Sequence, residues 1–255
     1  MGKNTSKDDF SRFSNIGYED FRDMAKDESL SRYEKVGFPD AYRAGKEKLI
    51  FDDMCSKLPA LERKESFILD IGSGCSDLPR FLIERATQKS QRLVLIDSAE
   101  MLDQLPVNPN VRKIPARYPD CPEFLEEYRG KFDAIITYSV IQYVFAEGNI
   151  FDFLDKSLQL LAPGGGMLIG DIPNLSMRKR FFASENGVAH HRQFTGSDET
   201  PLVTFNCLES RNIDDSVVLA LISRARAAGF HSFILPQASN LPMANRREDL
   251  LLVRP

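Results

Sequence analysis

A short apolar run that ends in two glycines constrains the fold of this 255-residue chain more than any other feature. Residues 67–71 have the sequence Phe-Ile-Leu-Asp-Ile, and Gly72-Ser73-Gly74 follow directly. A nearly continuous apolar run of this length is typical of a strand buried on both faces of a parallel sheet. Glycines at its end let the backbone turn tightly and approach a ligand closely. The run therefore predicts a buried strand with a ligand site at its carboxyl end.

Further apolar runs repeat this pattern along the chain. They predict strands over residues 93–96, 111–114, 132–137 and 167–170. Helical spacing of apolar residues predicts helices over residues 40–58, 78–87 and 151–161, the last one ended by Pro163-Gly164-Gly165-Gly166. Strands that alternate with helices indicate an α/β fold, with a parallel sheet covered by helices on both faces.

The end of the chain departs from this alternation. A helix is expected over residues 215–228, followed by strands over 230–235 and 249–253. The turn-rich stretch between these two strands has no helical pattern, so the strands are expected to be antiparallel to each other. The prediction is a seven-stranded, mostly parallel sheet with an antiparallel last strand.

Two segments lie outside the repeating pattern. Residues 1–60 combine many charges with aromatic side chains and are expected to form an N-terminal helical arm or lid. Residues 61–255 would form the α/β domain. Within it, residues 172–212 are polar, aromatic and basic without a clear period, which predicts an inserted lid or substrate loop.

Composition excludes several classes of protein. Hydrophobic residues make up 42% of the chain and charged residues 27%, which is typical of a globular protein. The net charge of −4 disfavours a nucleic-acid partner. Residues 1–10 are polar, and no run approaches about 20 apolar residues, so neither a signal peptide nor a membrane partner is expected. Four scattered cysteines predict reduced thiols in a cytoplasmic protein, and no metal site.

Acidic residues follow the first two predicted strands in a pattern that suits a ribose-containing ligand. Asp97 stands at the end of the second strand, where a carboxylate can accept hydrogen bonds from both ribose hydroxyls. The dinucleotide fingerprint G-x-G-x-x-G is not met, because Asp77 occupies the position of its third glycine. The alternative is a tight turn without a ligand.

Four motifs together resemble the class I S-adenosylmethionine-dependent methyltransferases. Residues 68–74 and 93–102 are similar to the first two motifs of that family, 132–144 to its fourth-strand motif, and 160–168 to the motif that leads into its fifth strand. The resemblance covers about residues 66–170. It implies a Rossmann-like methyltransferase domain over residues 61–255, with S-adenosylmethionine as cofactor.

The resemblance also implies roles by position. The loop Gly72–Gly74 would line the methionine and ribose end of the cofactor, and Met101 would pack on the adenine or form helix core. The acid that the family often places near Pro115–Tyr118 is missing, and Arg117 or Tyr118 would substitute for it. The cofactor-binding residues predicted in this way are Asp70, Gly72, Ser73, Gly74, Asp97, Ser98, Met101, Ala116, Arg117 and Tyr138.

The candidate catalytic residues lie at or after the ends of the predicted fourth and fifth strands. The methyl group of a sulfonium is already activated, so the protein mainly supplies alignment and an electrostatic site. A general base is needed only where the acceptor keeps its proton. His190 and His191 in the inserted loop are candidate bases and Asp171 is the alternative, while Tyr138 would lie near the transferring methyl.

Basic and aromatic residues could hold the acceptor. Arg178, Lys179 and Arg180 form a cluster that can clamp a phosphate or carboxylate, or else a solvated basic turn. Tyr18 and Arg43 of the arm could supply an aromatic and a cationic wall.

The segment from Gly170 to Phe182 is similar to methyltransferases encoded with bacterial surface-polysaccharide enzymes. That resemblance implies O-methylation of a small anionic, phosphorylated or glycan-related acceptor in polysaccharide biosynthesis. A homodimer stays open. The alternatives are a non-catalytic binding module with the same fold and a Rossmann NAD(P)-dependent oxidoreductase, which the lost third glycine and the lack of a Tyr-x-x-x-Lys pair disfavour.

Overall fold

The computed structural model describes residues 13, 16–207 and 209–255 of the chain. The expectation that residues 1–10 are no signal peptide lies outside these described residues. Within them, no helix is both long and apolar enough to cross a membrane.

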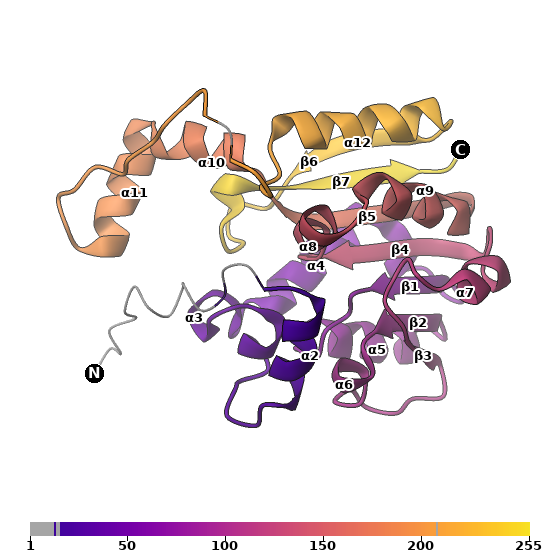
Figure 1. Ribbon diagram of the computed structural model, residues 1–255. Coiled ribbons are helices and arrows are strands. Elements are labelled where there is room, and N and C mark those ends of the chain that lie inside the picture. Colours follow the sequence, from indigo (N-terminus) through magenta and orange to yellow (C-terminus); the bar gives the residue numbers. More distant parts are fainter. Residues whose placement is uncertain (1–12, 14–15, 208) are drawn as a thin grey trace.

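Seven strands form one sheet in the order β3-β2-β1-β4-β5-β7-β6 (Figure 1). Strands β1 to β5 pair in parallel, and β7 is antiparallel to both of its neighbours. The strands are β1 Phe67–Ile71, β2 Arg92–Asp97, β3 Val111–Pro115, β4 Phe132–Tyr138, β5 Leu161–Pro173, β6 His231–Pro236 and β7 Arg247–Val253. The predicted Rossmann-like sheet with an antiparallel last strand is confirmed.

Helices cover both faces of this sheet. They are α2 Tyr18–Lys26, η1 Glu34–Val36, α3 Asp40–Arg43, α4 Glu47–Lys57, η2 Pro59–Leu61, α5 Leu78–Gln88, α6 Ala99–Leu102, α7 Pro122–Glu127, α8 Ile141–Glu147, α9 Ile150–Leu160, α10 Leu175–Phe182, α11 Glu185–Thr195, α12 Asp215–Ala227 and η3 Ala244–Arg246.

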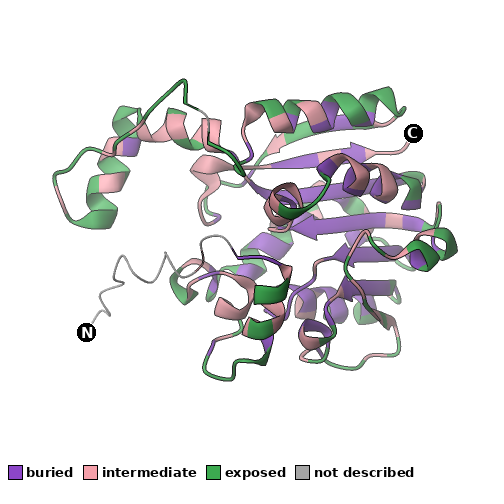
Figure 2. Ribbon diagram, viewed as in Figure 1, coloured by how far each residue is buried: buried purple, intermediate pink, exposed green. Residues whose placement is uncertain are grey.

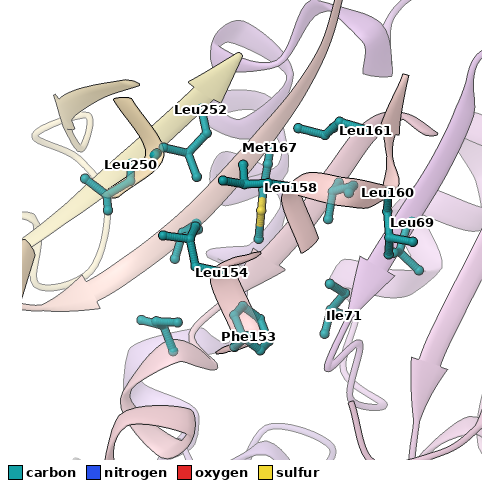
Figure 3. Close-up of a cluster of buried hydrophobic side chains, with 14 of the residues drawn as sticks. Leu69, Ile71, Phe153, Leu154, Leu158, Leu160, Leu161, Met167, Leu250 and Leu252 are labelled. Carbon is teal, nitrogen blue, oxygen red and sulfur yellow. The ribbon is translucent and has the colours of Figure 1, made fainter. Parts of the chain in front are cut away.

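The alternation of side chains along the strands divides the core between the two faces. Leu69 and Ile71 of β1 point to the face covered by α9 and α12, where Phe153 is fully buried (Figure 3). Ile68, between them in sequence, packs on the other face with α4 and α5. Because successive side chains of a strand alternate in direction, a strand covered on both faces must be apolar throughout.

Two predicted boundaries differ from the structure. The helix expected over 40–58 is divided into α3 and α4, because the intervening Gly45 has a left-handed φ of 71°. The fifth strand begins at Leu161, immediately after α9, and not at Met167. Its early part is drawn into the sheet by pairing between Leu161 and Phe132 of β4.

The stretch 172–212 is predicted to be an inserted lid or substrate loop without a clear period, and the structure shows regular elements within it. Its first residues continue β5, and α10 and α11 follow. Helix caps explain this: the side chains of Asn174 and Ser184 accept hydrogen bonds from the first turns, and Gly196 ends α11 with φ 67°. The two helices project beyond the end of the sheet at which β4 terminates, and α11 is largely exposed (Figures 1 and 2).

Candidate functional site

A cavity of about 480 Å³ lies at the carboxyl ends of β1, β2 and β4. Its walls come from the loops after these strands and after β3, together with α8 and the N-terminal segment. Ligands of open α/β sheets bind at this edge, next to the point where the strand order reverses. In this sheet the reversal falls between β1 and β4.

The loop after β1 requires its glycines. Gly72 and Gly74 have φ values of 73° and 66°, a region that other residues rarely adopt. A Cβ atom on Gly72 would also lie 2.6 Å from Cγ2 of Val140, and one on Gly74 would lie 2.7 Å from Cγ1 of Val36. The loop therefore presents bare backbone to the cavity, and Ser73 lines it as well.

Asp97 lines the cavity at the end of β2. Its Oδ2 accepts a hydrogen bond from the backbone N–H of Gly74 at 2.8 Å, and its Oδ1 accepts one from Ser98 at 2.6 Å. Burial raises the pKa of Asp97, and these two N–H groups oppose that rise. A carboxylate offers about four acceptor positions, so about two remain for a ligand.

Asp70 is buried beneath the glycine loop and does not line the cavity. Burial raises its pKa to about 7, the Ser73 hydroxyl opposes the shift, and the charge of Asp97 adds to it. Ser98 does not line the cavity either. Its side chain caps α6 by accepting from the N–H of Met101, which does line the cavity.

The loop after β3 forms the far side of the cavity. Ala116 and Arg117 line it, and the Arg117 guanidinium lies 5.2 Å from the ring centroid of Tyr18 and 3.5 Å from Glu147. Asp120 also lines the cavity. Sequence reasoning missed this residue because it searched for an acid only over residues 115–118, although Asp120 belongs to the same loop.

The N-terminal arm, here residues 16–57, covers the cavity. Its residues Tyr18 and Phe21 line the cavity. Arg22 forms a bidentate ion pair with Glu100 of α6, with 2.8 Å between Nη2 and Oε1. Tyr33 donates to Asp77 at 2.6 Å, and Arg32 pairs with the same carboxylate. Asp77, which breaks the dinucleotide fingerprint, therefore anchors the arm.

A strained polar cluster forms the end of the cavity near β4 and β5. Ser139 directly follows β4, and Asp171 lies in β5 next to Gly170, which pairs with Tyr138. Both residues have left-handed backbones, with φ values of 61° and 59°. Such a conformation costs about 1–3 kcal/mol per residue and persists where surrounding contacts determine it. Arg43 supplies those contacts, because its Nη2 donates to Asp171 at 3.0 Å and also to the Ser139 hydroxyl.

Arg43 and Asp171 form a buried ion pair, with side chains only 5% and 4% exposed. Arg43 and Ser139 line the cavity, whereas Asp171 lies behind them and accepts hydrogen bonds from both. The Nε of Arg43 has no hydrogen-bond partner within the described part of the chain. The cluster therefore leaves a buried donor at the edge of the cavity.

Tyr138 lines the same end, at the last position of β4. Burial raises its pKa well above the ordinary value, so the phenol is neutral near pH 7. Its hydroxyl accepts from Nε2 of Gln237 at 3.3 Å, and Gln237 also donates to Asp249 at 3.1 Å. Lys57 pairs with Asp249 at 2.7 Å. This network fixes the Tyr138 ring against the cavity.

The predicted bases in the insertion lie elsewhere. His190 and His191 belong to α11 and do not line the cavity. The His190 ring lies 5.6 Å from Phe181, and the His191 ring lies 6.2 Å from Phe182. Their catalytic role stays a prediction.

The basic cluster of α10 is divided between different partners. Lys179 pairs with Glu209 at 2.6 Å, and Arg180 pairs with Asp215. Arg178 instead lies over the Phe182 ring, at 5.6 Å from its centroid. None of the three basic residues lines the cavity. Among the described residues, no group of three or more His, Cys, Asp or Glu side chains has a metal-binding arrangement.

Comparisons with known proteins agree on the fold. The plantazolicin methyltransferase BamL, solved with a triazolic desmethylPZN analog and SAH, matches with a TM-score of 0.58 and 15% identity over 93% of this chain and 96% of that one. The CurJ carbon methyltransferase matches with a TM-score of 0.55 and 14% identity, over 100% and 72%. The chain has the fold of the class I methyltransferases.

The N-methyltransferase NodS from Bradyrhizobium japonicum WM9, in complex with SAH, has the same fold, with a TM-score of 0.54 and 12% identity over 93% of this chain and 98% of that one. No family model matches the chain. Chondramide synthase cmdD from Chondromyces crocatus is 38% identical over 55 residues, which is 22% of this chain. The chain matches about 1% of the length of that curated relative.

Proposed function

We propose that the protein is an S-adenosylmethionine-dependent methyltransferase that acts on a small molecule. One observation carries this proposal: Asp97 and two glycines with left-handed backbones line the same cavity, and Asp97 accepts a hydrogen bond from Gly74. This cavity lies at the carboxyl ends of the strands in a methyltransferase fold. The presence of SAH in the solved BamL and NodS structures supports it.

The residues of the cavity fit this cofactor. The acceptor positions left on Asp97 suit the two neighbouring hydroxyls of a ribose, and the backbone of Gly72 and Gly74 allows close approach of the methionine end. Arg117 and Asp120 would meet the adenine. When bound, the cofactor supplies a methyl group on a positively charged sulfur. The protein's share of the chemistry is then alignment and proton handling.

For the acceptor, we propose the end of the cavity formed by Arg43, Tyr138, Ser139 and Tyr143. An acceptor hydroxyl there would pass its proton to the Ser139 oxygen while Ser139 passes its own to Asp171, which already accepts that hydrogen bond. Asp171 is therefore the base we propose, because the cavity has no lining residue from α11 among the described residues.

We extend the proposal to O-methylation of a small anionic acceptor, phosphorylated or glycan-related, in bacterial surface-polysaccharide biosynthesis. The resemblance of residues 170–182 supports this pathway, and the cationic Arg43 at the acceptor end is consistent with an anion. A homodimer stays a prediction.

The oxidoreductase alternative is disfavoured by the sheet. Dinucleotide-binding domains have strand order 3-2-1-4-5-6 in a parallel sheet, whereas here antiparallel β7 is inserted between β5 and β6. The non-catalytic binding module remains the alternative. Formation of S-adenosylhomocysteine with any acceptor would exclude it.

Calorimetric titration with S-adenosylhomocysteine tests the cofactor assignment. A hydrogen bond to a charged group is worth about 1.5–3 kcal/mol, so Asp97→Ala should weaken binding about 100-fold. Asp97→Asn, which keeps one acceptor oxygen, should show a smaller loss. Asp103→Ala, on an exposed acid that follows α6, is the matched control and should bind normally. Unchanged binding by Asp97→Ala would contradict the proposed function.

A further inference from the structure

Three arginines come together where α10, η3 and β7 meet. Arg178 belongs to α10, Arg246 ends η3, and Arg247 begins β7. η3 packs directly against α10. The guanidinium groups of Arg178 and Arg246 each lie 5.6 Å from the centroid of the same aromatic ring, Phe182. Both cations therefore contact the same ring.

Arg178 and Arg246 lack a close ion-pair partner among the described residues. In the described part of the chain, no ion pair within 4.0 Å involves either residue, and the hydrogen bond from Arg246 goes to the neutral amide of Asn245 at 3.2 Å. Burial lowers the pKa of Arg246; repulsion from Arg247 and Arg178 lowers it further, while Tyr42 acts in the opposite direction. Like charges held together in a half-buried place are unfavourable unless an anion joins them.

The adjacent basic residues form a contrast on the same helix. Lys179 has Glu209 as its partner and Arg180 has Asp215. Arg178 feels Glu209 only as a more distant charge. Lys179 and Arg180 are therefore paired, whereas Arg178 has no ion-pair partner within 4.0 Å among the described residues and lies near η3.

Arg247 connects this group to the acceptor end of the cavity. Its Nη1 donates to the backbone oxygen of Asp171 at 3.0 Å and lies 3.6 Å from the Asp171 carboxylate. Burial raises the pKa of Tyr143, which lines the cavity, and the positive charge of Arg247 opposes that rise. Asp171, which Arg247 contacts, also accepts hydrogen bonds from Arg43 and Ser139, and these two residues line the cavity. Arg247 therefore lies close behind the acceptor end.

We propose that Arg178, Arg246 and Arg247 form a phosphate subsite that binds the acidic group of the acceptor at a distance from the methylated atom. The assignment of this phosphate to the acceptor rests on the proposed function. Guanidinium groups offer paired donors that match phosphate oxygens. Of the three cations, only Arg247 has a carboxylate within 4.0 Å among the described residues: Asp171, which already pairs with Arg43. The excess positive charge therefore suits a dianion.

The first test uses inorganic phosphate as the probe. The phosphate dependence of Tm, at constant ionic strength set with sodium chloride, gives its Kd. We expect the Arg178→Gln/Arg246→Gln double variant to bind phosphate at least tenfold more weakly than the unchanged protein. Arg180→Gln, which removes a neighbouring cation that is already paired, should change Kd less than twofold. Equal phosphate binding by the double variant and the unchanged protein would overturn the subsite.

Acetate in place of phosphate tests the chemical class of the ligand. Weaker binding of acetate supports a phosphate subsite, and binding of acetate as tight as that of phosphate overturns it. Arg178→Gln alone removes only an exposed side chain. It decides the question should the double variant fail to fold, with an expected loss of at least threefold in phosphate affinity; an unchanged affinity would count against the subsite.

Titration with S-adenosylhomocysteine separates this proposal from the proposed function. The double variant should bind it within twofold of the unchanged protein, because none of the three arginines lines the cavity. Loss of phosphate binding with intact S-adenosylhomocysteine binding supports the subsite. Failure of the unchanged protein to bind S-adenosylhomocysteine would overturn the proposed function and leave the phosphate result valid.

Discussion

The N-terminal arm and the insertion, here residues 174–212, flank the same edge of the sheet but are attached to it in different ways (Figure 1). The arm buries polar side chains against the domain. Arg43 forms an ion pair with Asp171, and Glu47 accepts a hydrogen bond from the first turn of α5. The insertion is held through α10, while α11 is largely exposed (Figure 2). The arm should therefore control stability and the cofactor, and the insertion should act only on the acceptor.

The largest expected effect is on the buried ion pair of the arm. Arg43→Met leaves the buried Asp171 with the more distant Arg247, at 3.6 Å, as its cationic partner among the described residues, and breaking a buried pair costs about 3–5 kcal/mol. We expect urea unfolding to show a loss of about 3 kcal/mol. Arg178→Gln in the insertion should change the free energy of unfolding by about 0.5 kcal/mol or less. Similar losses for both variants would remove the distinction between the two regions.

Removing one helix cap from the arm and one from the insertion should give a smaller difference in the free energy of unfolding. Glu47 accepts a hydrogen bond from the backbone N–H of Leu78 at 2.7 Å and is buried. Glu47→Ala should lower the free energy of global unfolding by about 1–2 kcal/mol, because that N–H then has no partner. Ser184→Ala removes the cap of α11.

For Ser184→Ala we expect faster amide exchange confined to α11, with a nearly unchanged free energy of global unfolding. Hydrogen exchange and urea unfolding on the two variants measure this difference. A global loss from Ser184→Ala would show that the insertion is coupled to the core.

The affinity for the cofactor should depend on pH through Asp70, the buried acid beneath the glycine loop. Burial raises the pKa of Asp70 to about 7, and the ammonium group of a cofactor bound above the glycine loop would favour the charged form of Asp70. Binding should therefore tighten as pH rises, by about eightfold between pH 6 and pH 7.5 if only the carboxylate form binds. Above this range the ligand's own α-amino group begins to lose its proton, since such groups have a pKa of about 7.7–8.0.

Calorimetry with S-adenosylhomocysteine at several pH values measures this dependence. Asp70→Asn should flatten it, and any remaining slope belongs to Asp97, whose pKa is also raised. An unaltered slope in Asp70→Asn would rule out Asp70 as the titrating group. Arg178→Gln should leave the slope unchanged.

The smallest effect is expected at the exposed pair between Arg180 and Asp215, whose side chains are 57% and 43% exposed. Surface pairs contribute about 0–1 kcal/mol, so Arg180→Gln should change the free energy of unfolding by at most about 0.5 kcal/mol. Urea unfolding in low and high salt measures it. A larger change, weakened by salt, would show that this pair anchors the insertion more firmly than its exposure suggests.

The sheet and the residues around the glycine loop could be predicted because their signals are local. An apolar run marks each buried strand, and the carboxyl ends of parallel strands meet at one edge, which brings Gly74 and Asp97 together. The caps Asn174 and Ser184 are local as well and could have located α10 and α11.

The acceptor end could not be predicted in this way. Arg43 and Asp171 are 128 residues apart, and no short pattern relates them. The arm was expected to carry aromatic and cationic walls, but its attachment through Arg32 to Asp77 depends on how the whole domain closes. Likewise, the three basic residues of α10 are equivalent in sequence, and only their partners across the fold distinguish Arg178.

The left-handed backbone of Ser139 has a consequence for engineering the protein. A glycine there would relieve about 1–3 kcal/mol of conformational strain but would lose two hydrogen bonds, one donated to Asp171 and one accepted from Arg43, which together are of similar worth at about 1 kcal/mol each. Ser139→Gly should therefore be nearly neutral in any selection for folded, soluble protein. The hydroxyl that faces the cavity would nevertheless be gone, so a library sorted only for thermostability would accumulate this silent loss of chemistry.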